Sequence, residues 1–155
     1  MSSLIGANTG ATTTTAEFGL GDRHVDHNGK VWVYVQASAT IAQYDVVVYD
    51  ESYTTLAAPV STSNDARGDK LGVAAVAFAD NEYGWLQIYG PCTLNVLGSC
   101  NPNVELTTTA TGGSLDDDTT SSLVVADGIV TTAASVSAAS AKAGVLNFPV
   151  VGRTL

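Results

Sequence analysis

Histidine and aspartate side chains, which supply the ligands of many metal sites, gather in the short segment from Asp22 to His27. If that segment is a strand, His24 and Asp26 share one face, where they and Asp22 would form a weak metal site. The interpretation that we favour is a polar hairpin that turns at Asn28-Gly29. Its histidines would then be exposed or hydrogen-bonded to the backbone.

Three consecutive carboxylates, Asp116, Asp117 and Asp118, form a second group with the chemistry to bind a cation. Calcium takes roughly six to eight oxygen ligands, and clustered carboxylates attract it. The spacing of an EF-hand loop is absent, however, and the side chains of adjacent residues point in different directions. We therefore predict a solvated turn here and no metal site.

Cys92 and Cys100 are the only cysteines, and a turn that contains Gly98 lies between them. This spacing leaves a small hairpin disulfide geometrically possible. The N-terminus lacks the basic and apolar regions of a secretory signal, so we expect a reducing cytoplasm and two free, half-buried thiols. Two cysteines without further ligands at matching spacing predict no zinc site.

Motifs of known catalytic chemistry are absent from the sequence. There is no G-x-S-x-G elbow, no P-loop and no dinucleotide fingerprint, and no pattern pairs either histidine with a nucleophile. Glu17 and Glu105 have nothing around them that marks a glycosidase pair. We predict that the protein is not an enzyme and uses no cofactor.

The charge of the chain limits its partners. The net charge is −9, and only 14% of the residues are charged, against about 25% in average globular proteins. The six basic residues are scattered singly, so we expect neither direct nucleic-acid binding nor attraction to an anionic membrane. No apolar run approaches the roughly 18 residues of a membrane span. Short uncharged side chains must cover much of the surface, and they lose little rotamer entropy when a partner buries them.

The body of the chain reads as a series of short strands. Apolar or alternating runs occupy residues 31–35, 45–49, 71–78, 85–89, 93–97, 104–107, 123–125, 128–131 and 145–151. Turn residues separate them at Asn28-Gly29, Arg67-Gly68, Tyr83-Gly84, Gly90-Pro91, Gly112-Gly113 and Asp127-Gly128. Residues 133–143 have helix-forming composition but no apolar stripe and no cap, so we predict a loop or a single turn there. The pattern predicts an all-β domain over residues 17–155, folded as a barrel or sandwich.

Residues 1–16 differ from the rest because they contain no charged side chain and end in a threonine-rich stretch. Two interpretations remain open for this extended N-terminal arm. It is either a disordered terminus or an arm that becomes ordered on a neighbouring subunit by adding to a sheet edge.

Aromatic residues at strand spacing are more typical of a core or an interface than of a sugar-binding platform. The residues concerned are Trp32, Tyr34, Tyr83, Trp85 and Tyr89.

Several segments together resemble the small capsid decoration (cement) proteins of tailed bacteriophages. They are EFGLGDRHVDHNGKVWVYV with QASATIAQYDVVVYDE, then LGVAAVAFADNEYGWLQIYGPCTLNVLGSCNPNVELTTTATGGSLDDD, and finally GVLNFPVVG. The resemblance covers about residues 17–152 and leaves the N-terminal arm outside. The similarity lies in the types of residue and their order along the chain, and it includes no catalytic motif.

The resemblance implies an all-β, β-tulip-like fold with little helix, and a protein that is made in the bacterial cytoplasm and bound on the outer face of the virion capsid. It also implies a homotrimer that clamps neighbouring major capsid subunits. At these interfaces we expect Leu4, Ile5, Thr13, Thr14, Phe18, Tyr83 and Trp85. The alternative is a receptor- or glycan-binding module of a head or tail fibre, which would use Trp32, Trp85 and tyrosines as stacking surfaces.

Overall fold

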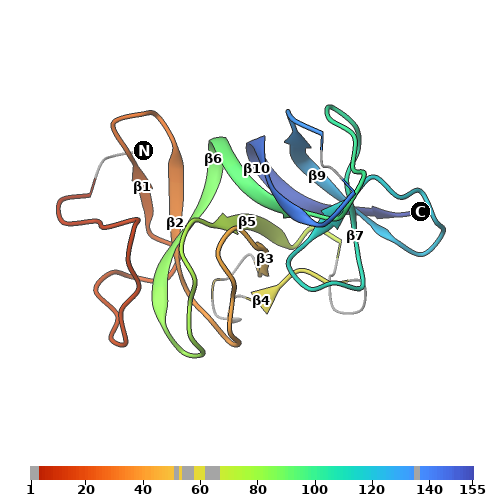
Figure 1. The fold of residues 1–155 in the computed structure, drawn as a ribbon. Coiled ribbons are helices and arrows are strands. Elements are labelled where there is room, and N and C mark those ends of the chain that lie inside the picture. Colours follow the sequence, from red (N-terminus) through yellow and green to blue (C-terminus); the bar gives the residue numbers. More distant parts are fainter. Residues whose placement is uncertain (1–3, 51–52, 54–57, 62–66, 135–136) are drawn as a thin grey trace.

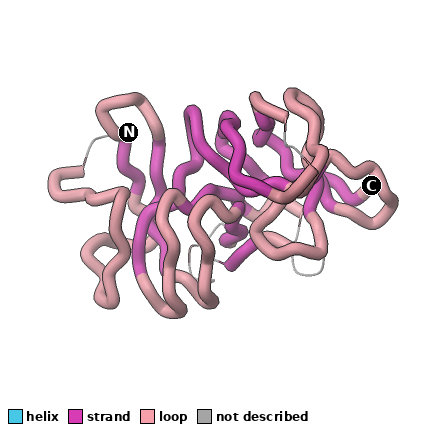
Figure 2. Tube along the Cα trace, in the orientation of Figure 1, coloured by secondary structure: helices cyan, strands magenta, loops and turns pink. Residues whose placement is uncertain are grey.

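The computed structural model describes residues 4–50, 53, 58–61, 67–134 and 137–155, and within these residues the chain is all-β, as predicted (Figure 2). None of these residues forms a helix, so no helix there has the length and apolar character to cross a membrane. The strands are β1 (Arg23–Val25), β2 (Val31–Gln36), β3 (Val46–Tyr49), β4 (Ala58–Pro59), β5 (Lys70–Ala74), β6 (Tyr83–Val96), β7 (Thr107–Thr108), β8 (Leu115–Asp116), β9 (Val124–Thr131) and β10 (Ser140–Thr154).

The long strand β6 joins the two halves of the fold (Figure 1). Its first half pairs with β2 on one edge and with β5 on the other. Its second half pairs with β10 from Tyr89 to Val96, and at its end with β8. From β6 the sheet continues through β10 to β9 and β7, and β7 pairs with β8, so these five strands close a short ring.

The core follows this division. One cluster fills the ring with Leu94, Leu106, Leu115, Ile129 and Leu146 among its members, all at most 2% exposed. A second cluster lies between the β2–β6 pair and β3 with β5. The third cluster lies on the opposite face of β2 and β6 and contains Trp32, Tyr34 and Trp85. Because a strand alternates its side chains, β2 buries valines on one face and aromatic rings on the other.

Three of the predicted turns, Gly90-Pro91, Tyr83-Gly84 and Asp127-Gly128, lie instead inside strands. Gly90-Pro91 does not end a strand, because β10 pairs with β6 through this point and holds it in the sheet. Gly90 adopts a φ of 94°, which bends β6 without interrupting it. Tyr83-Gly84 also belongs to β6, because the strand begins at Tyr83. Asp127-Gly128 lies within β9, opposite an irregular stretch of β10 between Leu146 and Val150.

Two further predictions of element bounds were wrong. The run from residue 71 leaves the sheet after Ala74, four residues before its predicted end. Residues 140–143 belong to β10 and not to a loop, because their small side chains pair with β6.

Candidate assembly surfaces

The residues predicted for an interface meet at one end of the molecule, where the N-terminal arm lies against β2 and β6 (Figure 1). Leu4, Ala7 and Phe18 pack on the third core cluster. The ring of Phe18 contacts Tyr34 and Trp85 edge to face, with centroids 5.4 and 5.2 Å apart. Edge-to-face contact is a favoured geometry of aromatic pairs, so Phe18, just after the arm, and Leu4 and Ala7 of the arm cover the aromatic face of the sheet.

Hydrogen bonds fix the arm to the strands beneath it. Thr13 and Tyr83 exchange two backbone hydrogen bonds of 2.9 and 2.8 Å. The Thr12 hydroxyl donates to Glu82 Oε2 at 2.8 Å, and the Leu4 amide donates to His24 Nδ1 at 3.0 Å. Hydrogen bonds from the Ala79 amide and from Thr12 lower the pKa of Glu82. These contacts hold the described part of the arm against the sheet of its own chain, with one isolated bridge at Thr13.

The seven predicted residues divide into inward and outward groups. Leu4, Phe18, Tyr83 and Trp85 turn toward the aromatic cluster, and Thr13 pairs with β6. Ile5 and Thr14 turn outward, and Ile5 is 100% exposed. We call Ile5, Thr14 and the exposed Leu20 the arm surface.

The aromatic residues predicted as core or interface are mostly enclosed. Trp32, Tyr34 and Trp85 are at most 5% exposed, so their rings offer no open stacking surface. A cavity of about 280 Å³ remains between the arm and β6, bordered by Asn8, Glu17 and Tyr83. Tyr89 is an exception, because it is 40% exposed.

A second uncharged surface lies on the outer face of β6, β9 and β10. Val145 pairs with Val130 of β9 on one side and with Pro91 of β6 on the other, and all three are exposed. Tyr89 lies on the same face, next along β6. We call Tyr89, Pro91, Val130 and Val145 the barrel face. The sequence pattern missed it, since Val130 and Val145 become neighbours only through a pairing that local patterns do not specify.

The histidine segment forms the hairpin that we favoured. Asp26 and Lys30 close the turn by backbone hydrogen bonds, and Gly29 has a φ of 76°. Asp26 Oδ1 accepts hydrogen bonds from the amides of Asn28 and Lys30, and its Oδ2 accepts one from Trp32 Nε1 at 3.3 Å. Partial burial raises the pKa of Asp26, but these hydrogen bonds outweigh it and leave the pKa lowered. The Asp26 carboxylate therefore holds the turn together.

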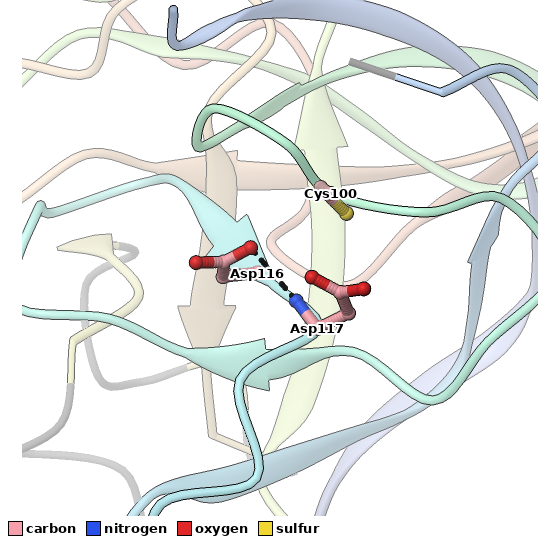
Figure 3. A group of neighbouring side chains, drawn as sticks. All are labelled: Cys100, Asp116 and Asp117. Atoms are coloured by element: carbon pink, nitrogen blue, oxygen red, sulfur yellow. Dashed lines mark hydrogen bonds between the residues drawn. The ribbon is translucent and has the colours of Figure 1, made fainter. Parts of the chain in front are cut away.

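Metal-ligating side chains converge elsewhere among the described residues, at Cys100, Asp116 and Asp117 (Figure 3). Asp116 ends β8 and is half-buried, so the prediction of a solvated turn was wrong for this residue. Each group has a hydrogen-bond partner. Asp117 Oδ2 accepts from the Asn101 amide and side chain, Asp116 Oδ1 accepts from the Asp117 amide, and the Cys100 thiol donates to the Asn101 carbonyl.

The pKa values of Asp116 and Asp117 shift in opposite directions. Burial, followed by the neighbouring carboxylates, raises the pKa of Asp116. Burial also raises the pKa of Asp117, but its hydrogen bonds, chiefly those from Asn101, together have a larger, opposite effect. The pKa of Asp117 is therefore lowered. The arrangement connects the segment after β6 to β8.

Both cysteines are free thiols, as predicted. Cys92 is half-buried, whereas Cys100 is buried at 1% exposure because its side chain belongs to the core inside the ring. Burial raises the pKa of Cys92 to about 12. A thiol of this kind is a poor nucleophile, since the thiolate is the reactive form.

Comparison with models of protein families, with curated proteins and with solved structures gave no match.

Proposed function

We propose that this protein is a structural component of a bacteriophage virion, a decoration protein that binds the outer surface of the capsid and clamps neighbouring major capsid subunits. The observation that carries the proposal is the exposure of two sets of uncharged residues, the arm surface and the barrel face, on a chain of net charge −9. The N-terminal arm lies at one end of the molecule beside β1 and β2, whereas β9 lies toward the other end (Figure 1). The resemblance of residues 17–152 to decoration proteins supports the same function.

The two surfaces suit two different partners. The barrel face contains valine, proline and tyrosine, and we assign it to contacts between copies of this chain in a homotrimer. The arm surface would then contact the major capsid protein. Many copies with modest contacts give firm attachment, because linked binding events raise the effective concentration of each contact.

The arm can contribute without unfolding from its own domain. Its inward residues stabilise the aromatic cluster, and its outward residues Ile5 and Thr14 remain available to a partner. The excess of acidic residues favours a positively charged capsid surface and speeds the encounter with it.

The test is sedimentation of the protein with purified heads that lack it. We expect the wild-type chain to bind heads and Ile5→Asp to bind at least tenfold more weakly. Val104→Asp is the matched control, because Val104 is also exposed but lies outside both surfaces. We expect it to bind as the wild type does.

The outcomes separate the function from the assignment of the surface. If the wild-type chain bound no heads, the decoration function would be wrong. If it bound heads and Ile5→Asp bound them equally well, only the role of the arm surface would be wrong.

A further inference from the structure

A small cavity of about 70 Å³ lies where β1, β3, β5, β6 and β10 meet. Its apolar wall consists of Leu71, Ile88, Phe148 and Pro149, and its polar groups come from Arg23, Tyr49 and Lys70. No carboxylate is among the described residues that line it. Its volume suits one small polar group.

Two of the six cations of this acidic chain border the cavity. Within the described residues, neither Arg23 nor Lys70 forms an ion pair, whereas Arg153 pairs with Glu105 at 3.0 Å. The Arg23 guanidinium has only a long contact of 3.4 Å to the Tyr53 hydroxyl. Among the described residues these two cations have no carboxylate partner, so an anion bound in the cavity would neutralise their charge.

Tyr49 adds a hydrogen-bond donor to these two cations. Its side chain is only 4% exposed and lines the cavity. Burial raises the pKa of Tyr49, which keeps the hydroxyl protonated and able to donate.

The backbone of β10 is irregular where Phe148 and Pro149 form part of the cavity wall. The register between β9 and β10 shifts between Leu146 and Val150, and Phe148 adopts a φ of 47°. Left-handed backbone is unfavourable for a bulky residue and persists only where the surroundings enforce it. The Phe148 ring stacks on Tyr89 with centroids 5.1 Å apart, which holds it at the cavity.

We propose that this cavity is a binding site for an oxyanion, a carboxylate or a phosphate group, held by Arg23, Lys70 and the Tyr49 hydroxyl. The guanidinium and ammonium groups supply charge-assisted hydrogen bonds, and the hydroxyl supplies a neutral one. The apolar wall limits the size of the anion and admits an apolar body beside it. Phe148 places the site next to the barrel face, because its ring stacks on Tyr89.

The test is titration of the isotope-labelled protein with inorganic phosphate, sulfate, acetate and benzoate at constant ionic strength, followed by amide chemical shifts. We expect saturable shifts confined to residues around Lys70, Ile88 and Phe148. Tight binding of benzoate alone would identify an organic carboxylate as the ligand, and binding of phosphate or sulfate alone would identify an inorganic anion.

Three variants assign the groups. Lys70→Gln, Arg23→Gln and Tyr49→Phe should each weaken binding about tenfold, which is the size expected for loss of a charge-assisted or buried hydrogen bond. Lys142→Gln removes the same charge elsewhere and should leave the affinity unchanged. The proposal is overturned if no anion gives saturable shifts, or if Lys142→Gln weakens binding as much as Lys70→Gln.

Discussion

Gly84 lies where the arm crosses β6, and the space around it is filled. A methyl group at this position would lie 2.7 Å from Phe78 Cε1 and 3.2 Å from the Thr12 methyl carbon. The arm thus approaches the sheet closely because Gly84 has no side chain.

Gly84→Ala should lower the free energy of unfolding by about 1–3 kcal/mol, the usual cost of overpacking a filled site. Urea unfolding followed by tryptophan fluorescence measures the change. Gly112→Ala is the control, since a methyl group there meets only Pro59 Cβ at 3.7 Å and φ is not positive. Equal stability of the two variants would contradict the packing argument.

Asp26 gives the hairpin a dependence on pH. Its pKa in the folded protein lies below the ordinary value of 3.8. A carboxyl group shifted in this direction stabilises the fold above its unfolded pKa, and the stabilisation is lost as pH falls through the folded pKa. We expect the free energy of unfolding to fall as the solution is acidified below about pH 4.

Asp26→Asn should lower the stability at pH 7 by about 1 kcal/mol and remove part of this acid dependence. Denaturant unfolding at several pH values between neutral and strongly acidic measures both effects. Asp80→Asn removes an exposed carboxylate and should change neither. An unaltered acid slope in Asp26→Asn would show that other groups produce it.

At the residue scale, features that depend on neighbours in the sequence could be predicted. The Asn28-Gly29 turn was predictable because a glycine with positive φ and a nearby aspartate are sufficient to form it. The burial of Trp85 followed from its strand spacing. The exposed Val130 and Val145 and the cationic cavity were not predictable, because their residues come from strands far apart in the sequence.

At the scale of elements, the N-terminal arm acts as a cover for the aromatic face. Leu4 and Ala7 pack on the cluster of Trp32, Tyr34 and Trp85, and Thr13 pairs with Tyr83. Without the arm, water would reach the indole of Trp85, which is now 2% exposed.

Deletion of residues 2–16 should therefore lower the free energy of unfolding by about 2 kcal/mol or more, from lost apolar burial and hydrogen bonds. Tryptophan emission should shift to the red. Ile5→Ser is the matched control in the arm, and it should keep both the unfolding midpoint and the emission of the wild type. If the deletion variant retained them too, the arm would have no role in the fold.

Strand bounds show why a local pattern was insufficient for the elements. Gly90-Pro91 has the composition of a turn, yet β10 pairs through it and keeps β6 continuous. A turn preference of two residues is weak against a row of hydrogen bonds to a neighbouring strand. The all-β class was predictable, because alternation and turn residues recur along the chain, whereas strand length depended on partners.

At the scale of the whole molecule, the barrel face should produce a homotrimer. Its residues are uncharged on a chain of net charge −9, so contact there avoids most of the repulsion between copies. Val145→Glu would place like charges against one another and should yield monomers. Size-exclusion chromatography with light scattering measures the mass.

Ser121→Glu adds the same charge in an exposed turn and should remain trimeric. A wild-type chain that stayed monomeric at every concentration would rule out the trimer. A trimeric Val145→Glu would move the interface away from the barrel face.

The central position of β6 also governs how fast the chain reaches its native state. Its partners come from both directions along the sequence: Thr12 bonds to Glu82 across 70 positions, and Ser140 pairs with Val96. Closing such long loops costs entropy before the contacts that repay it exist. Chains dominated by distant pairings fold in roughly milliseconds to seconds, and we expect this one to fold at the slow end, with β6 exposed until both sets of partners arrive.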